Sequence, residues 1–320
     1  MPSTPWILTE AHLDSAIAAV RDACSGTPLV PAPKVAPRVW LKVETEQPTG
    51  AFKVRGALAK LASLGPDERA RGVIAASAGN HGLGVAWAGK RLGIRVTVVV
   101  PESAPRVKRD GIRALGAEVL TAAGGYDDAE VVARERSTTE SRTFVSPYDD
   151  PFVAAGNGGT LGVEILRALP HASAIVTPIG GGGLAIGLAA ARRREGAKLR
   201  IVGVQSEACP AMVRSLAEGR ALERFEGAPT LAEGLEGGVS SSAFELVRRE
   251  VDEVTLVSEL AIAMAMRFAK RELGRTLEGS AAVALAWAID NAEKLPGDGP
   301  VVVILTGQNV DPGTLARVLS

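Results

Sequence analysis

Six runs of mostly aliphatic residues, separated by stretches with helical character, most constrain how this chain can fold. The runs are GVIAAS, RVTVVV, AEVLTA, ASAIVTPI, RIVGVQ and PVVVILT. Helical patterns lie between them, over 81–92, over 106–115 and from about residue 184. Apolar strands that are continuous rather than alternating are buried on both faces, as in parallel sheets covered by helices. The sequence therefore predicts an α/β fold whose ligands bind at the carboxyl ends of the strands.

Length and composition set the broad class. The chain has 320 residues, 46% of them apolar, which is enough for two lobes. Its 36 basic and 36 acidic side chains balance, so we expect no nucleic-acid partner and no membrane partner. The N-terminus lacks a signal-peptide pattern, and a cytoplasmic protein is expected. Three histidines and two cysteines without ligand spacing predict no metal site.

Lys53 follows Phe52 directly, close to a Pro-Thr-Gly turn. A lysine is usually a solvated surface charge. At a sharp turn off a buried strand, however, the amine can be partly desolvated, which lowers its pKa and leaves a neutral nucleophile. The lysine motif by itself leaves both interpretations open.

Two strand ends carry unusual polar residues. In SAGNHG, Ser77, Gly79 and Asn80 precede a helix, whose free amides could bind a carboxylate or a phosphate. Helix capping would explain one polar residue here, but not the whole cluster. At the end of VVVILTGQN, the Thr306 hydroxyl is either a simple cap or a functional group.

A third strand end carries four consecutive glycines within residues 177–187. Without side chains, successive amides can close around an anion with a helix dipole behind them. A dinucleotide-binding loop is an alternative, because Gly181, Gly183 and Gly187 approximate its fingerprint and Glu207 could bind a ribose. This loop therefore predicts phosphate binding and leaves the cofactor open.

Taken together, these loops resemble the pyridoxal-phosphate enzymes of the tryptophan-synthase-β fold (fold type II), specifically the serine/threonine dehydratase group. The matching motifs are QPTGAFKVRGA, SAGNHGLGVA, GGGGL and TGQN, in this order. SPYDDP, GVQSE, AEGL and LEGSAAVALA extend the resemblance over nearly the whole chain. The dinucleotide alternative offers no role for Lys53 and is disfavoured.

The resemblance implies two lobes, each a mostly parallel twisted sheet flanked by helices, with the cofactor between them. We expect a large lobe over 1–69 and 148–320, and a small mobile lobe over 70–147. The chain stops fourteen residues after Thr306, so no C-terminal regulatory domain is expected. The resemblance also implies a homodimer.

The resemblance assigns cofactor-binding roles as well. Lys53 would carry pyridoxal 5'-phosphate as a Schiff base, with Phe52 beside it. Asn80 would bind the 3-oxygen of the ring, and Thr306 would face the pyridine nitrogen. Glu278 matches a position close to the cofactor, although a surface glutamate at a helix start is an equal alternative. The phosphate would be held by the backbone amides of Gly180, Gly181, Gly182, Gly183 and Leu184.

The implied activity is elimination of water from a β-hydroxy-L-amino acid such as threonine or serine, giving a 2-keto acid and ammonia. Lys53, once released, would remove the α-proton. The neutral hydroxyl of Thr306 would not hold the pyridine nitrogen protonated, which favours prompt β-elimination. The substrate carboxylate would lie against Ser77, Ala78, Gly79, Asn80 and His81.

Other activities stay open at this point. They are β-replacement, racemisation, dinucleotide-dependent oxidoreduction and amino-acid binding without turnover. Related serine racemases have a second serine where this chain has Ala78, which disfavours racemisation. Relatives with a cation site carry a carboxylate where this chain has Gln205, which argues against that site. Gln308 and the loop 155–160 also depart from the common pattern and leave the exact substrate open.

Overall fold

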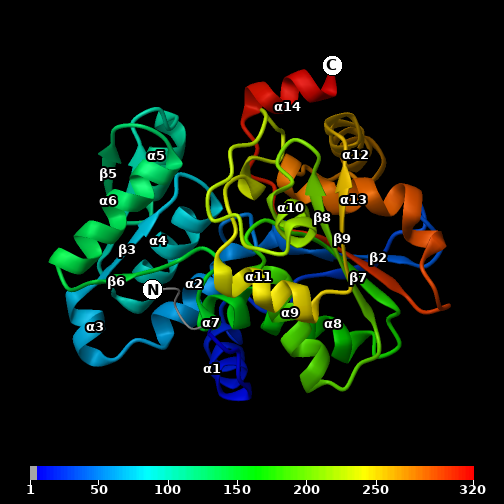
Figure 1. Ribbon diagram of the computed structural model, residues 1–320, viewed down its shortest axis with the longest axis horizontal. Coiled ribbons are helices and arrows are strands. Elements are labelled where there is room, and N and C mark those ends of the chain that lie inside the picture. The colour runs from blue at the N-terminus through cyan, green and yellow to red at the C-terminus, as the bar shows by residue number, and fades with distance from the viewer. Residues whose placement is uncertain (1–5) are drawn as a thin grey trace.

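The computed structural model describes residues 6–320, which form two sheets in two lobes (Figure 1). The larger sheet contains, in spatial order, β1 (Leu29–Pro31), β2 (Val39–Val43), β10 (Val301–Leu305), β7 (Ala174–Pro178), β8 (Arg200–Ser206) and β9 (Glu253–Val257). The smaller contains β5 (Glu118–Ala122), β4 (Val96–Pro101), β3 (Val73–Ala76) and β6 (Thr143–Phe144). Neighbouring strands are parallel except β1 and β2. The predicted α/β class with two mostly parallel sheets is confirmed.

Helices cover both faces of each sheet. Around the larger sheet lie α1 (Glu10–Val20), α7 (Pro151–Ala154), α8 (Thr160–Ala168), α9 (Gly183–Arg194), α10 (Ala211–Glu218), α11 (Ser241–Glu250), α12 (Glu259–Glu272), α13 (Gly279–Asn291) and α14 (Pro312–Leu319). Around the smaller lie α2 (Lys53–Ala62), α3 (Pro66–Arg71), α4 (Asn80–Leu92), α5 (Arg106–Ala114) and α6 (Tyr126–Thr139). Short turns of helix are η1 (Glu44–Glu46), η2 (Ala155–Gly159), η3 (Glu233–Leu235) and η4 (Ala292–Lys294).

Strand β10 shows why the apolar runs are continuous. Val301, Val303 and Leu305 pack in the core on the α12–α13 side of the sheet. Val302 and Ile304 point the other way, into the core formed with α8 and α9. All five side chains are fully buried. A strand covered on both faces has no solvent side, so no polar residue interrupts it.

Strands β1, β6 and β9 were not predicted from the sequence. Each lies at an edge of its sheet, and β6 has only two residues. In β9, Glu253, Val254, Thr255 and Leu256 are all only partly buried. Edge strands are half exposed and carry polar residues, which weakens the apolar pattern on which the prediction rests.

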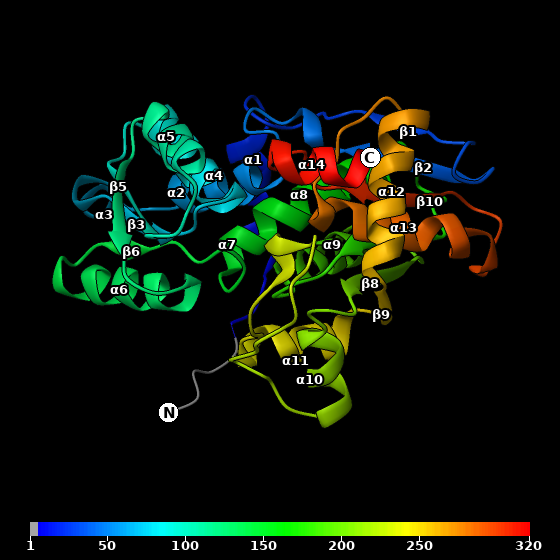
Figure 2. The ribbon, with the colours of Figure 1, turned by 90° about the horizontal axis from the view of Figure 1, so that it is seen from above.

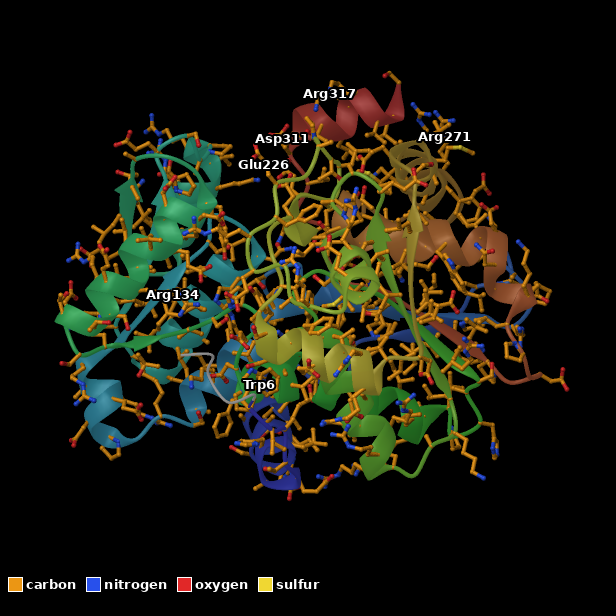
Figure 3. The ribbon with its side chains drawn as sticks, in the orientation of Figure 1. Trp6, Arg134, Glu226, Arg271, Asp311 and Arg317 are labelled. Carbon is orange, nitrogen blue, oxygen red and sulfur yellow. The ribbon has the colours of Figure 1, made fainter. Side chains whose placement is uncertain are left out.

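The chain crosses between the lobes near residues 145–150, just before α7, which lies between them when the molecule is viewed from above (Figure 2). Trp6, labelled in Figure 3, donates a hydrogen bond from its ring nitrogen to Asp149 at 2.6 Å. The lobe boundaries at 69/70 and 147/148 stay a prediction. Helix α2, which that division assigns to the large lobe, packs its apolar face in the core of the smaller sheet.

No helix within residues 6–320 combines the length and the apolar character needed to cross a bilayer.

Candidate active site

Lys53 is the first residue of α2 and lies where the two lobes meet. Its amine donates a hydrogen bond to the carbonyl of Pro147, on the crossing segment, at 2.9 Å. Burial lowers the pKa of Lys53 to about 8, although the negative charge of Glu278 acts in the opposite direction. A substantial fraction of this amine is therefore neutral near physiological pH, as a nucleophile requires.

The turn before Lys53 is bound to the end of β10. The Phe52 amide donates to the carbonyl of Thr306 at 2.9 Å, and Ala51 forms an isolated antiparallel bridge with Gly307. The Lys53 nitrogen lies 5.2 Å from the centre of the Phe52 ring. These contacts bring the lysine motif and the buried end of β10 together, although about 250 residues separate them in the chain.

The loop before α4 carries Ser77, Ala78 and Gly79, and Asn80 is the first residue of the helix. The Ser77 hydroxyl accepts a hydrogen bond from the Gly79 amide at 3.1 Å. His81 is buried, and its Nε2 lies 2.8 Å from the carbonyl of Val145. Burial and the positive charge of Lys53 lower the pKa of His81 to about 3. A neutral His81 therefore donates from Nε2 to the carbonyl of Val145.

Glu278 precedes α13 and contacts Asn80 from the opposite lobe. The Asn80 side-chain nitrogen donates to both carboxylate oxygens of Glu278, at 2.8 and 3.0 Å. Burial raises the pKa of Glu278 to about 7, while Asn80, Lys108 and Lys53 favour its ionised form and Glu233 opposes it. The side chain does not cap its own helix. Glu278 thus belongs to the junction of the lobes rather than to the surface.

The tetraglycine loop connects β7 to α9 and is closely covered. A β-carbon added at Gly181 would lie 2.5 Å from the ring of Tyr148, and one at Gly183 would lie 2.8 Å from its carbonyl oxygen. Gly182 has a φ of +91°, which favours glycine for backbone reasons alone. Some of the glycines are therefore required by the packing of Tyr148, as well as by any anion.

Five successive amides of this loop are free. Within residues 6–320, no backbone or side-chain acceptor binds the amide hydrogens of Gly180, Gly181, Gly182, Gly183 or Leu184. They stand at the N-terminus of a twelve-residue helix, where the dipole favours a negative charge. The loop contacts Tyr148 and the amine of Lys53 contacts Pro147, so both groups lie against one short segment.

These groups fit pyridoxal phosphate. The free amides suit its phosphate, and the neutral amine of Lys53 suits its aldehyde. The Thr49 hydroxyl, four residues before Lys53, is buried and has no partner among residues 6–320. A buried polar atom without a partner indicates a place where a ligand or a water completes the site.

A π-helical turn, η2, supports both α2 and α9. It lies in the loop 155–160, which departs from the common pattern of the resembled family, and single π-helical turns are frequent at functional sites. The side-chain oxygen of Asn157 accepts a hydrogen bond from the Gly56 amide in α2 at 2.9 Å. A β-carbon at Gly156 would meet the backbone of α2, and one at Gly158 would meet that of α9. The lysine helix and the glycine-loop helix thus rest on one segment.

A buried ionic cluster escaped the sequence analysis. Arg55, two residues after Lys53, is fully buried and lies 2.7 Å from Glu44 and 2.6 Å from Glu164. Lys42 contacts Glu164 at 2.6 Å. Although burial disfavours its charge, the two carboxylates raise the pKa of Arg55. The available signal was a charged residue inside an apolar pattern, in KVRGALA and in VWLKV.

Gln205 occupies the position where a carboxylate would suggest a cation site. Its side-chain oxygen accepts hydrogen bonds from the amides of Met212 and Val213, both at 3.0 Å, and so caps α10. In the described part of the chain, no three histidine, cysteine, aspartate or glutamate side chains gather as a metal site.

Known proteins are similar to this chain over most of its length. Residues 20–307 match the family model described as pyridoxal-phosphate dependent enzyme. The chain is 41% identical to L-threonine ammonia-lyase of Thermotoga maritima, over 88% of this chain and 70% of that protein. It is 35% identical to a catabolic L-threonine dehydratase of Staphylococcus aureus, over 99% of this chain and 93% of that protein.

Solved structures extend the likeness to the fold. Threonine deaminase isoform 2 of Solanum lycopersicum, in its processed form, has a TM-score of 0.89 and 32% identity, covering 99% of this chain and 92% of that one. Maize serine racemase has a TM-score of 0.90 and 27% identity, covering 98% and 97%. The predicted fold of the serine/threonine dehydratase group is confirmed.

Proposed function

Because this chain belongs to the family of pyridoxal-phosphate dependent enzymes, we propose that it is an ammonia-lyase for a β-hydroxy-L-amino acid such as threonine or serine. The products are a 2-keto acid and ammonia. One observation carries the proposal: the lysine amine and the glycine loop lie against consecutive residues, Pro147 and Tyr148. The similarity to threonine ammonia-lyases supports the choice of reaction.

Several residues would hold the cofactor. Lys53 would bind it covalently with Phe52 beside it, and the amides from Gly180 to Leu184 would bind its phosphate. Asn80 would bind the 3-oxygen and Thr306 the pyridine nitrogen, with Glu278 close by. Bound pyridoxal phosphate supplies an electron sink for the pair left at the α-carbon of the substrate.

Lys53 acts as the base. Its neutral nitrogen takes the proton from the α-carbon, and the Pro147 carbonyl, which accepts from this nitrogen, holds the resulting ammonium in place. The β-hydroxyl leaves as water with one added proton, which balances the proton that Lys53 removes from the α-carbon. A water molecule then adds to the α-carbon of the released enamine, in its imine form, and ammonia leaves to give the 2-keto acid. The reaction as a whole involves no net oxidation or reduction.

The substrate carboxylate lies at the N-terminus of α4, against Ser77, Ala78, Gly79, Asn80 and His81. The amides of this turn and the helix dipole favour its negative charge. The small lobe, residues 70–147, closes over it and excludes water. Lys108 of α5 contacts Glu233 of η3 at 3.2 Å, which supports a closed arrangement of the lobes. We propose a cytoplasmic homodimer, as the sequence features and the family resemblance imply.

A racemase is the second candidate, because the fold also matches maize serine racemase over nearly its whole length. Ala78 opposes this assignment, since its methyl group offers no proton donor. A β-replacement synthase would use the same cofactor site. Both alternatives are distinguished from the lyase by their products.

The test is a product assay on the purified enzyme with its cofactor. With L-threonine or L-serine we expect the 2-keto acid and ammonium in equal amounts. Added thiol should leave this yield unchanged. Inversion of serine without ammonium would assign the racemase instead, and incorporation of the thiol would assign the synthase.

The rate at which the cofactor-free protein captures pyridoxal phosphate should rise with pH. Lys53 attacks only as the neutral amine, and burial places its pKa at about 8, so the neutral fraction grows as pH increases through that value. Stopped-flow absorbance from about pH 6.5 to about pH 9.5 measures this rate. Because the charge of Glu278 raises the pKa of Lys53, Glu278→Gln should move the midpoint to lower pH. A rate that does not change with pH contradicts the assignment of Lys53.

A further inference from the structure

Asn309 connects three segments that are distant in the sequence. It stands four residues after the end of β10, in the TGQN motif. Its side-chain nitrogen donates to the carbonyl of Thr49 at 2.7 Å and to the side-chain oxygen of Asn80 at 2.8 Å. Both amide hydrogens are thereby used. One segment lies in the turn before Lys53, and the other begins α4.

The contact with Thr49 determines which way these amides point. A backbone carbonyl only accepts hydrogen bonds, so Asn309 must present its nitrogen to this side. The same nitrogen then faces Asn80, which must present its oxygen. The Asn80 nitrogen is therefore turned toward Glu278, to which it donates at 2.8 and 3.0 Å. The Thr49 carbonyl therefore determines the orientation of the Asn309 amide, which in turn determines the orientation of the Asn80 amide toward the Glu278 carboxylate.

We propose that Asn309 is a positioning residue, which keeps the side-chain nitrogen of Asn80 directed at Glu278, among the residues that would hold the cofactor. The inference rests on the proposed lyase function and adds a residue to its site. Asn80 and Asn309 lie on opposite lobes, so this orientation is established when the lobes come together.

The turn around Gly50 supports this role. Gly50 has a φ of +72°, and a β-carbon there would lie 2.7 Å from the side-chain oxygen of Asn309. The asparagine oxygen thus rests against a residue that lacks a side chain. Its nitrogen is left to face the two oxygen acceptors.

The pKa of Glu278 should depend on the orientation of the Asn80 side-chain amide. The groups that influence this carboxylate are Asn80 of α4, Lys108 of α5, Glu233 of η3 and Lys53 of α2. Burial raises the pKa of Glu278 to about 7, and the donor from Asn80 lowers it. If Asn80 turned its oxygen toward the carboxylate, this stabilisation of the ionised form would be lost, and the pKa would rise further.

Asn309→Asp is the sharpest variant, because it preserves shape and removes both donors. Asn80 should then turn its nitrogen toward the introduced carboxylate and its oxygen toward Glu278. If the ionised Glu278 supports turnover, the acidic limb of the kcat–pH profile should move upward by roughly one unit. At pH 7, kcat should fall about fivefold, because the ionised fraction of Glu278 drops from about one half to about one tenth when its pKa rises from about 7 by one unit, while KM changes little.

Gln308→Glu is the matched control, since it makes the same change of charge on the same loop. Gln308 is exposed and donates to the carbonyl of Thr45 at 2.9 Å, away from Asn80. In this variant, the acidic limb of the kcat–pH profile should stay at its wild-type position. Asn309→Ala, which adds no charge, should give a smaller upward shift than Asn309→Asp. If Asn309→Asp titrates like Gln308→Glu, the inference is overturned.

A second readout separates this inference from the proposed function. The visible absorbance of bound pyridoxal phosphate is titrated with pH, without substrate, in wild type, Asn309→Asp and Gln308→Glu. A transition displaced only in Asn309→Asp supports the role of Asn309, and coincident transitions overturn it. If the wild type yields no keto acid, the proposed function fails, while this titration still decides the role of Asn309.

Discussion

Lys53→Ala is expected to abolish turnover, with kcat for L-threonine falling by at least about 1,000-fold. In the proposed function, one nitrogen atom would serve both as the covalent link to the cofactor and as the base. The variant should also lack the visible absorbance band of covalently held pyridoxal phosphate, whereas the wild-type band should shift when L-threonine is added. The keto-acid assay and absorbance spectra, recorded side by side with wild type, measure these effects.

Lys60→Ala is the control for Lys53→Ala. Lys60 lies on the same helix, two turns further on, and its amine contacts Asp150 at 2.7 Å. Its loss removes an equal charge from α2 without touching the proposed site, so the band and the turnover should persist. A Lys53→Ala protein that keeps the band would refute the assignment of Lys53. If wild type and variant are both colourless after reconstitution, the glycine loop binds another phosphate ligand.

Arg55→Met is expected to destabilise the fold by about 3–5 kcal/mol. The introduced methionine has a volume similar to that of arginine. It leaves Glu44, which is fully buried, and Glu164 without their strongest partner. An uncompensated buried charge costs more than the original pair contributed, because water is not there to solvate it. Urea unfolding followed by circular dichroism measures the free energy of unfolding.

Arg167→Met serves as the comparison for Arg55→Met. Arg167 pairs with Glu195 at 3.2 Å, but its side chain is 60% exposed. Solvent screens such a pair, so its loss should change the free energy of unfolding by less than about 1 kcal/mol. Equal unfolding curves for Arg55→Met and wild type would show that the buried cluster contributes nothing to stability.

Arg55→Met should also weaken cofactor binding. Arg55 stands two residues after Lys53, so its ion pairs hold the first turn of α2 against η1 and α8. If the first turn of α2 moves when these ion pairs are lost, the Lys53 amine moves away from Pro147 and from the glycine loop. The expected weaker retention of pyridoxal phosphate on dialysis distinguishes this effect from a loss of global stability alone.

Several parts of the site could be predicted because their signals are local. Asn80 and the surrounding Ser77–His81 motif occupy consecutive positions at a strand end, as do Gly180–Leu184. Chain geometry alone then places their amides at the start of a helix. Glu278 was ambiguous for the opposite reason. A glutamate before a helix reads equally well as a surface residue, and its partner Asn80 lies 198 residues away.

The sequence by itself determined the α/β class, the positions of the buried strands along the chain and the glycine-rich loops. Each of these follows from residues that are neighbours in the chain, through burial on both faces of a strand or through backbone freedom at a turn. The tertiary structure alone decided the packing of Tyr148 against Gly181, the ionic cluster at Arg55 and the bond from Asn309 to Asn80 across 229 residues. Hydrogen bonds and charges act over a few ångströms in space, so their partners are set by how the lobes fold together and not by any pattern along the chain.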